Sequence, residues 1–251
     1  KDVVGQQAIT NTLLNAIENN HLAQALLFTG PRGVGKTTCA MILAKMINSD
    51  ENHTENEDFA FNIFELDAAS NNSVEDIRHL IDQVRIPPQV GKYKVYIIDE
   101  VHMLSNSAFN ALLKTIEEPP PYIVFIFATT EIHKVPATIK SRCQQFNFRL
   151  ISTDTIKKLL ADISNESELK FEDDALFWIA KEATGSLRDA YTLYDQVVSF
   201  SSGVLTLSKI REKLGLVGLD QMNELVELMA EGKAAEVIEY GESIPKDTYI
   251  P

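Results

Sequence analysis

The sequence predicts an α/β fold followed by a smaller helical region, and three observations lead to this. Short apolar runs alternate with amphipathic stretches of helical spacing over the first 150 residues. These runs are rich in Ile, Val and Phe and lack a polar face, as expected of parallel strands that helices cover on both sides. After about residue 150, helical patterns follow one another and no further strand is predicted.

The elements of the first region are predicted in order from these patterns. Strands are expected at residues 25–28, 62–67, 93–98, 122–128 and 145–148. Helices are expected at residues 7–20, 36–48, 73–84 and 107–116, with a short one just before residue 142. Three prolines at 119–121 end the helix that precedes them. Residues 49–60, SDENHTENEDFA, are polar and acidic and are predicted to be a solvated loop.

The second half of the chain is predicted to be helical. Helices are expected at residues 153–163, 171–183, 186–200 and 207–214, and a further pair at 220–230 and 233–240. We therefore expect three domains. These are an α/β domain at 1–150, a small all-helical domain at 151–215, and the start of another helical domain at 216–251.

The composition excludes some classes of protein. Lys and Arg total 23 against 36 Asp and Glu, a net charge of −13, which argues against a protein that coats nucleic acid by itself. Cys39 and Cys143 have no metal-ligand spacing and favour a reducing compartment. No apolar run has the length of a membrane span, and the N-terminus has no secretory pattern. We expect a soluble intracellular protein of the cytoplasm, with no membrane partner.

The stretch GPRGVGKTT at residues 30–38 carries the clearest chemistry. It fits the phosphate-loop pattern G-x-x-x-x-G-K-[ST], in which backbone N–H groups wrap a triphosphate. Lys36 supplies charge to the β and γ phosphates, and the Thr37 hydroxyl ligates Mg²⁺. The strand before and the helix after favour this function over an ordinary Gly-rich turn. The predicted nucleotide-binding residues of the loop are Gly30, Pro31, Arg32, Gly33, Val34, Gly35, Lys36, Thr37 and Thr38.

Two further strands end in polar residues at the edge where ligands bind in open α/β sheets. KVYIIDEVH ends in Asp99, expected to hold Mg²⁺ through water, and Glu100, expected to polarise an attacking water. FIFATTEIHK carries Thr129 and Thr130, either of which could orient the same water. Alone, the acidic pair could be two exposed loop carboxylates, and the threonine pair could reflect β propensity.

Two arginines lie where an external anion would suit them. Arg188 is expected in the first turn of a helix, where the helix dipole disfavours a cation unless an anion is near. It could equally pair with Asp189 or Asp195. Arg142 lies between a short helix and an edge strand, and there it is either a solvated loop charge or a group that reaches outside its own chain.

Taken together, the motifs resemble the AAA+ ATPases. In the order DVVGQ, GPRGVGKTT, ELDAAS, VYIIDEVHMLS, FNALLKTIEEPP, FIFATTE, SRCQQF and GSLRDA, they are similar to the gamma/tau family of the bacterial DNA polymerase III clamp loader. The resemblance covers residues 2 to about 218. It implies an AAA+ ATP-binding domain at 1–150, a helical lid at 151–215, and the beginning of a collar domain at 216–251.

The resemblance implies a function and roles for single residues. The chain would be an ATPase of the DNA polymerase III holoenzyme, a DNA-directed DNA polymerase (a transferase), which uses ATP and Mg²⁺ to load the sliding clamp onto primed DNA in replication. By the same match, Arg142 is an arginine finger that acts in trans on a neighbour's γ phosphate. Thr130 is the polar sensor, Arg188 is a second sensor, and Val4 and Gly5 line the adenine pocket.

The sequence departs from the family in two regions. Family members usually carry a four-cysteine zinc module after the first helix that follows the phosphate loop, but residues 48–62 hold no cysteine. His53 is a lone imidazole there, so no zinc site is predicted. Weak contacts with the DNA backbone are expected at two helix starts, where the same side chains also favour helix capping. The candidate DNA residues are Asn71, Asn72, Ser73, Asn106 and Ser107.

The expected partners are other clamp-loader subunits in a hetero-oligomeric ring, the sliding clamp and primer–template DNA. The collar domain holds the rings of this family together, and only its beginning is expected in this chain. The chain alone is therefore expected to be monomeric. Two alternatives remain. A non-hydrolysing stator of the same ring would lack the phosphate-loop lysine or the acidic pair, and both are present. A branch-migration helicase motor would need DNA-translocating elements that the sequence does not contain.

Overall fold

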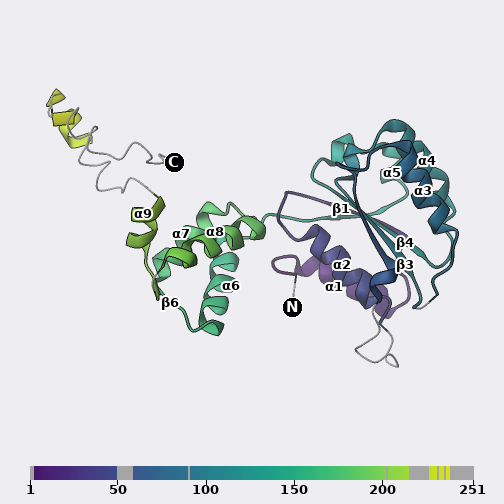
Figure 1. The fold of residues 1–251 in the computed structure, drawn as a ribbon, viewed down its shortest axis with the longest axis horizontal. Helices are drawn as coiled ribbons and strands as arrows, with labels where there is room; N and C mark the ends of the chain where they lie inside the picture. Colours follow the sequence, from purple (N-terminus) through teal and green to yellow (C-terminus); the bar gives the residue numbers. More distant parts are fainter. Residues whose placement is uncertain are drawn as a thin grey trace. The chain divides into compact units, whose positions relative to one another are not determined.

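The computed structural model describes residues 3–49, 59–89, 91–201 and 203–214, with short stretches at 226–230, 232–234 and 236–237. The chain divides into two compact units, Lys1–Ile151 and Ser152–Pro251 (Figure 1). The expected loop with His53, and most of the expected collar at 216–251, lie outside the described residues. No helix in the described part of the chain is long and apolar enough to cross a membrane.

The first unit is built on a five-stranded parallel sheet in the order β2-β3-β4-β1-β5. The strands are β1 Ala25–Thr29, β2 Ile63–Asp67, β3 Lys94–Asp99, β4 Ile123–Thr129 and β5 Gln144–Asn147. Every residue of β1 and β4 is buried, as are the first five of β3, because these strands are central and covered on both faces. The predicted parallel sheet is confirmed, with each strand within one or two residues of its expected bounds.

Helices cover both faces of this sheet. Figure 1 shows α1 and α2 on one face and α3, α4 and α5 on the other. The helices are α1 Gln7–Glu18, α2 Lys36–Met46, α3 Val74–Val84, α4 Asn106–Glu117 and α5 Ala137–Lys140. Short 3₁₀ turns lie at η1 Phe59–Asn62, η2 Val101–Met103 and η3 Ile132–Lys134.

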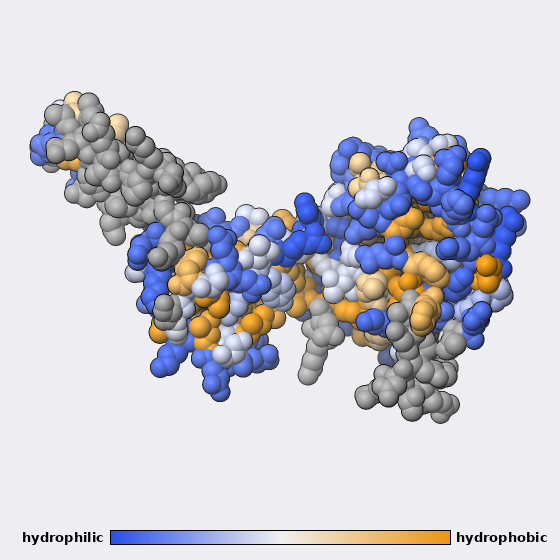
Figure 2. Space-filling model, in the orientation of Figure 1, coloured by the Kyte–Doolittle hydropathy of each residue, from blue (hydrophilic) through white to orange (hydrophobic). Residues whose placement is uncertain are grey.

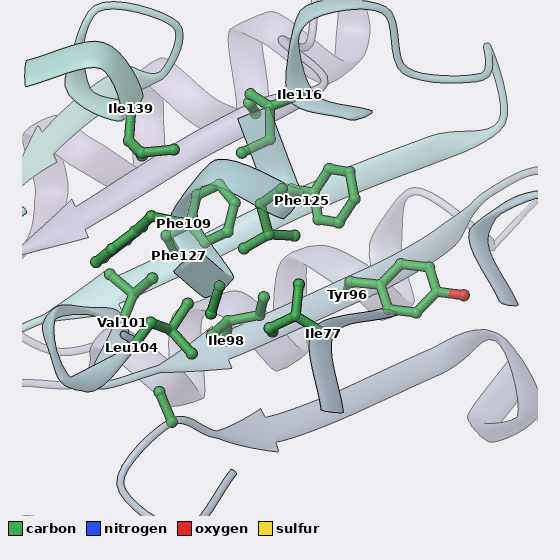
Figure 3. Packing of buried hydrophobic residues seen from close by; sticks show 14 of the residues in the cluster. Ile77, Tyr96, Ile98, Val101, Leu104, Phe109, Ile116, Phe125, Phe127 and Ile139 are labelled. Atoms are coloured by element: carbon green, nitrogen blue, oxygen red, sulfur yellow. The ribbon is translucent and has the colours of Figure 1, made fainter. Parts of the chain in front are cut away.

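Two hydrophobic cores result, one on each face. On the α3 and α4 face, Phe125 and Phe127 of β4 stack with ring centroids 5.8 Å apart and join a cluster with Phe109 of α4 (Figure 3). On the α1 and α2 face, Phe28 of β1 packs with Phe146 of β5 at 5.7 Å. Both cores bury the large apolar side chains that the sequence places on successive strand positions. On the surface in Figure 2, hydrophilic side chains predominate and hydrophobic ones form small groups between them.

The helices begin where the sequence provides caps. Ser73 caps α3 and accepts a hydrogen bond from the backbone N–H of Asp76, whose carboxylate in turn accepts from the Ser73 backbone. Ser105 caps α4 by accepting from the N–H of Ala108. These caps fix the starts of two helices at one edge of the sheet, where the loops after β2 and β3 also lie.

The second unit contains α6 Thr153–Glu166, α7 Asp173–Glu182, α8 Leu187–Phe200 and α9 Leu207–Leu214, which confirms the four predicted helices. The expectation that no strand follows residue 150 was wrong. β6 Lys170–Phe171 and β7 Val204–Leu205 form a two-stranded parallel ladder, extended by a hydrogen bond from Glu172 N–H to the Leu205 carbonyl (2.9 Å). Two residues are too few to show strand alternation, so the pairing of distant backbone segments has no sequence signal.

Candidate nucleotide site

The phosphate loop connects β1 to α2 and depends on three glycines. Gly30, Gly33 and Gly35 have φ angles of 137°, 74° and 96°, which favour glycine because a Cβ would clash with the backbone. A Cβ on Gly30 would also lie 2.3 Å from the Phe148 carbonyl oxygen. At Gly35, the N-cap of α2, a Cβ would meet nothing within 4 Å. The backbone in front of α2 is therefore open to an anion, as the helix N-terminus requires.

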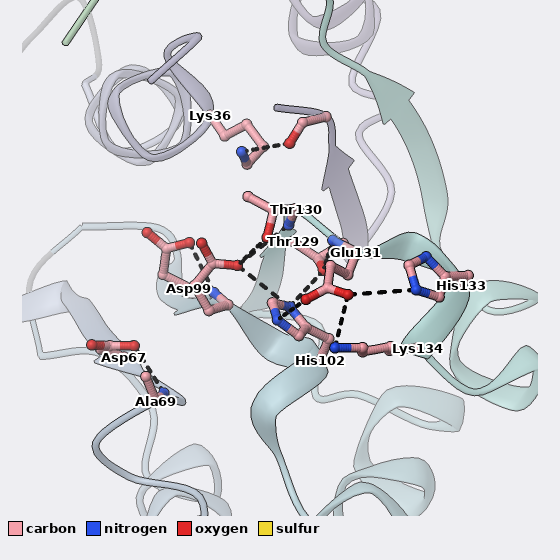
Figure 4. A network of polar contacts seen from close by, with 12 residues as sticks. Lys36, Asp67, Ala69, Asp99, His102, Thr129, Thr130, Glu131, His133 and Lys134 are labelled. Atoms are coloured by element: carbon pink, nitrogen blue, oxygen red, sulfur yellow. Dashed lines mark hydrogen bonds and ion pairs between the residues drawn. The ribbon is translucent and has the colours of Figure 1, made fainter. Parts of the chain in front are cut away.

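The charged side chain of Lys36 lies against this loop. It is the first residue of α2 and only 6% exposed, and its Nζ donates to the carbonyl oxygens of Gly30 (2.8 Å) and Pro31 (2.7 Å) (Figure 4). Of the other predicted loop residues, Val34 is buried in the core below. Arg32, Pro31 and Thr38 are exposed.

The two residues predicted to share a magnesium ion lie together. The Thr37 hydroxyl donates to Asp99 Oδ2 at 2.7 Å, and Asp99 Oδ1 accepts from the Glu100 backbone N–H at 2.8 Å. Thr37 is the second residue of α2 and Asp99 ends β3, so the fold brings together residues that are 62 positions apart. A hydroxyl and a carboxylate are the hard oxygen ligands that Mg²⁺ prefers, and the donor set fits that ion.

Glu100 leaves the strand in an unusual conformation. Its φ angle is 46°, in the left-handed region that non-glycine residues rarely adopt. Its Oε2 accepts from the hydroxyl (3.0 Å) and the backbone N–H (3.3 Å) of Thr130. The predicted water-activating carboxylate and the predicted sensor hydroxyl are therefore in direct contact, at the end of neighbouring strands.

The sequence reasoning assigned no role to His102, although the structure places it in the same network (Figure 4). Its Nδ1 lies 2.9 Å from Thr129 Oγ1 and 3.3 Å from Glu100 Oε2, and its Nε2 lies 3.4 Å from Glu131 Oε1. The side chain is 5% exposed. One signal was available, because His102 follows Asp99 by three residues, and a single tight turn after a strand brings such a residue back to the same edge.

Glu131 closes the network at the surface. Its carboxylate contacts Lys134 Nζ (2.8 Å) and His133 Nε2 (3.4 Å), and its backbone N–H donates to Thr129 Oγ1 (3.0 Å). The hydrogen bond from Lys134 holds the pKa of Glu131 below its usual value, with a smaller effect from the two nearby histidines. Glu131 therefore stays anionic at neutral pH.

Gln6 is a second residue that the sequence reasoning missed. It is 4% exposed, and its side chain bonds the Arg149 carbonyl (2.8 Å), the Arg149 N–H (3.3 Å) and the Val34 carbonyl (3.5 Å). The neighbouring Gly5, predicted with Val4 to line an adenine pocket, has a φ of 72° and packs against Ile151. The segment around Val4 and Gly5 is thus tied to the phosphate loop and to the exit of β5.

The structure does not bring Arg142 to the phosphate loop of its own chain. Arg142 precedes the start of β5, whereas the loop follows the end of β1, and these strands are parallel neighbours, so the two lie at opposite ends of the sheet. Its guanidinium donates to the Thr138 carbonyl (2.6 Å) and pairs with Glu117 at the end of α4. The side chain remains 34% exposed. Burial raises the pKa of the adjacent Cys143 thiol to about 12, so this cysteine is not a nucleophile.

Arg188 lies in the second unit, as the second residue of α8. The Ser186 hydroxyl caps this helix by accepting from the Asp189 N–H (3.3 Å), which confirms the predicted helix start. Arg188 is exposed. A role at the phosphates stays a prediction.

The candidate DNA residues lie at the starts of α3 and α4, which are joined by a hydrogen bond from Ser105 N–H to the Asn72 carbonyl (3.3 Å). Three of the five side chains make local hydrogen bonds. Ser73 caps α3, the Asn71 amide donates to the Asp67 carbonyl (3.1 Å), and the Ser107 hydroxyl contacts that of Ser105 (3.1 Å). Asn106 is the first residue of α4. Among the five candidates, only Ser73 caps a helix, while Asn71 and Ser107 make other local hydrogen bonds. Contact with DNA stays a prediction.

Two models of known protein families match the chain. One, described as DNA polymerase III, delta subunit, matches residues 5–152. The other, described as DNA polymerase III clamp loader subunit, ATPase lid domain, matches residues 155–203. The two matches adjoin near the boundary between the two units of the structure.

Curated relatives carry related names. The chain is 46% identical to DNA polymerase III subunit tau of Bacillus subtilis over 87% of its own length and 40% of the relative's. It is 42% identical to the Escherichia coli tau subunit over 94% of its length and 39% of the relative's. It is also 42% identical to DNA polymerase III subunit gamma of Buchnera aphidicola, over 88% and 63%. The chain thus spans less than two thirds of the length of these relatives.

Among solved structures, the Thermotoga maritima protein titled RuvB Holliday junction branch migration motor is similar, with a TM-score of 0.65 over 92% of this chain and 78% of that one, at 19% identity. A point variant of the same RuvB gives a TM-score of 0.67 at 18% identity, over the same shares of the two chains. Identities this low show the fold alone, which is the predicted α/β AAA+ fold with a lid. Because its first family model covers 148 of the 251 residues, the chain belongs to the DNA polymerase III family that this model describes, and its second unit carries the ATPase lid of a clamp loader subunit.

Proposed function

We propose that the chain is the ATP-hydrolysing motor of a bacterial replicative clamp loader, which loads the sliding clamp onto primed DNA within the DNA polymerase III holoenzyme. The contact between Thr37 and Asp99 at 2.7 Å carries this proposal. The contact joins the phosphate loop, which contains Thr37, to the acidic pair, which contains Asp99. Hydrolysis of Mg·ATP requires both of these parts in one chain. The names of the relatives support the choice of replication as the process.

Each residue of the site has a task in the proposed reaction. The open backbone at Gly35 and the start of α2 would receive the phosphates, and Lys36 would leave the Gly30 and Pro31 carbonyls to pair with them. Glu100 would accept a hydrogen bond from the attacking water, with Thr130 fixing its carboxylate. The network thus orients the water before reaction, which lowers the entropic cost of attack.

Thr37 and Asp99 are the residues that would hold magnesium, directly or through water. When bound, Mg²⁺ supplies neutralisation of the phosphate charge. The side chains that this chain contributes already lie within hydrogen-bonding distance of each other. Little rearrangement of the sheet edge is therefore needed on binding.

Arg142 would serve the active site of the neighbouring subunit. Its place at the opposite end of the sheet from its own phosphate loop, and its partly exposed guanidinium, support action in trans. Delivery of an arginine finger by a partner is worth about 10³–10⁵ in turnover, so hydrolysis becomes conditional on a complete ring. Arg188 would act as the second sensor, and Val4 and Gly5 would line the adenine pocket, both by family resemblance.

The proposal includes partners and location. The chain would assemble with other clamp-loader subunits, bind the sliding clamp, and contact primer–template DNA weakly through the starts of α3 and α4. The net charge of −13 agrees with weak affinity for DNA outside an assembled ring. The cytoplasm, where bacterial chromosomes are replicated, is the proposed location.

The alternatives are weaker. A stator has no need of a lysine held in the phosphate loop or of the contacts that Asp99 makes with Thr37 and Glu100. A branch-migration motor agrees with the RuvB fold, but the relatives at 42–46% identity are polymerase subunits, against 18–19% for RuvB. Sequence similarity of that size favours the clamp loader.

Phosphate release by the full-length protein, mixed with partner subunits and clamp, tests the proposal. Primed DNA should produce a burst of hydrolysis, and Glu100→Gln should abolish the burst while a fluorescent ATP analogue still binds. Turnover that ignores both DNA and clamp would overturn the clamp-loader function. Failure of wild-type protein to hydrolyse ATP under any of these conditions would overturn the motor function.

A further inference from the structure

The imidazole of His102 is buried at the reactive edge of the sheet. It lies in η2, the single 3₁₀ turn that follows Glu100, and its side chain is 5% exposed. Buried polar rings are normally held by hydrogen bonds, because an unsatisfied nitrogen loses its contacts with water. The partners of this ring are functional side chains, which distinguishes it from an ordinary core histidine.

Both ring nitrogens face oxygen atoms of the site. At the inner end, Nδ1 lies 2.9 Å from Thr129 Oγ1 and 3.3 Å from Glu100 Oε2. At the outer end, Nε2 lies 3.4 Å from Oε1 of Glu131, whose side chain is 36% exposed. Figure 4 shows dashed contacts that run from the His102 ring to Thr129 and to Glu131. The ring therefore joins the ends of β3 and β4 to η3.

The contacts to Glu100 are unequal between its two oxygens. The Thr130 hydroxyl, the Thr130 N–H and His102 Nδ1 all lie next to Oε2. None of these three contacts uses Oε1. A carboxylate held by one oxygen has its second oxygen fixed in direction, and that second oxygen is the one left to accept from water.

We infer that His102 is a positioning residue for the Glu100 carboxylate, anchored at its outer end by Glu131. The inference rests on the proposed ATPase function and deepens it. His102 keeps Oε2 engaged so that Oε1 faces the attacking water, and Thr130 donates a hydrogen bond to Oε2 as well. It acts through Glu100 and touches neither nucleotide nor water itself.

Two substitutions separate the two ends of the ring. In His102→Asn, the amide nitrogen replaces Nδ1 and keeps the contact toward Thr129 and Glu100. In His102→Gln, the amide nitrogen replaces Nε2 and keeps the contact with Glu131. Both are introduced into the full-length protein, assembled with partner subunits, clamp and primed DNA. Phosphate release gives kcat and KM, and a fluorescent ATP analogue gives nucleotide affinity.

The positioning role predicts a specific order. Gln should lower kcat between about 10- and 100-fold, because a carboxylate displaced by an ångström costs this much. Asn should lower kcat several-fold less. KM and analogue affinity should change less than about twofold in both variants, since the ring does not contact nucleotide.

His133→Gln is the matched control. His133 contacts the same Glu131 carboxylate at 3.4 Å, but its side chain is 73% exposed and it does not reach Glu100. Its removal should leave kcat unchanged. A double-mutant cycle adds a second readout, because His102→Gln should cause no further loss in single-turnover rate when Glu100 is already Gln.

The outcomes are distinct. Equal losses in the Asn and Gln variants, with weaker nucleotide binding and lower melting temperatures, would assign His102 to structure alone and overturn the inference. Variants that match His133→Gln in kcat would overturn it as well. If the wild-type protein itself shows no turnover, the proposed ATPase function is wrong. This outcome is distinct from failure of the His102 inference, because it is observed without any variant.

Discussion

The phosphate edge of the sheet and the corner around Arg142 are built in opposite ways. At the edge, Thr37, Asp99, Glu100 and Thr130 bond one another within the chain, at 2.7 to 3.3 Å. At the corner, Arg142 is partly exposed and is held by an exposed carboxylate and one carbonyl. One half of the proposed reaction centre is preorganised by the fold, whereas the other half is the one that we propose another subunit supplies.

The largest effect is expected at the phosphate loop. Lys36→Ala removes the charge that meets the phosphates, so nucleotide binding should be lost and kcat/KM should fall by more than about 10⁴-fold. Binding of a fluorescent ATP analogue and phosphate release would measure this. Lys45→Ala, on the exposed side of the same helix, is the control and should retain both. Retained binding in the Lys36 variant would show that the edge does not hold phosphate.

Arg142→Ala should show that the Arg142 corner contributes to turnover but not to nucleotide binding by its own chain. In the assembled ring, turnover should fall about 10³-fold while analogue binding is unchanged, because the lost charge belongs to a neighbour's site. The unassembled protein, at its much lower rate, should not respond to the substitution. A loss of equal size in the unassembled protein would place Arg142 in its own active site and contradict the topology of β5.

The stability of the phosphate edge should also depend on the absence of side chains at its glycines. Gly30→Ala forces a Cβ within 2.3 Å of the Phe148 carbonyl, and should lower the free energy of unfolding by about 2–4 kcal/mol. Gly35→Ala meets no neighbour within 4 Å and should cost only the backbone strain of about 1–2 kcal/mol. Urea denaturation of both variants measures the difference. Equal losses would mean that the contact with Phe148 relaxes freely.

The smallest effect is expected at the corner. Glu117→Gln removes the carboxylate that pairs with Arg142 and should change the free energy of unfolding by less than about 1 kcal/mol, since the pair is exposed. In the ring, turnover should rise by about two- to fivefold, because a neighbour's phosphate no longer competes with Glu117 for Arg142. Glu118→Gln is the control, as this adjacent exposed carboxylate should leave turnover unchanged. A fall in turnover with Glu117→Gln would instead assign Glu117 to holding Arg142 in place for the neighbour.

The sequence predicted the parallel sheet, its flanking helices and the phosphate loop, because long periodic segments and glycine spacing are local signals. It did not predict the ladder between β6 and β7. Each strand has only two residues, and the two strands are far apart in the sequence. It also gave no role to His102, since the partners of the ring are Thr129, at the end of the next strand, and Glu131, just before η3. The pairing of Arg142 with Glu117 was equally out of reach, because it depends on where α4 ends relative to α5.

The close approach of Gly30 to Phe148 places the phosphate loop against the end of β5. Phe148 follows β5, its N–H donates to the Thr29 carbonyl at 2.7 Å, and its own carbonyl lies against the loop glycine. Arg142 lies two residues before the other end of β5, a strand about 13 Å long that stretches little. The phosphate loop therefore contacts one end of the strand that has Arg142 near its other end. In the proposed ring, β5 would therefore connect the phosphate loop of one subunit to the arginine that serves the site of its neighbour.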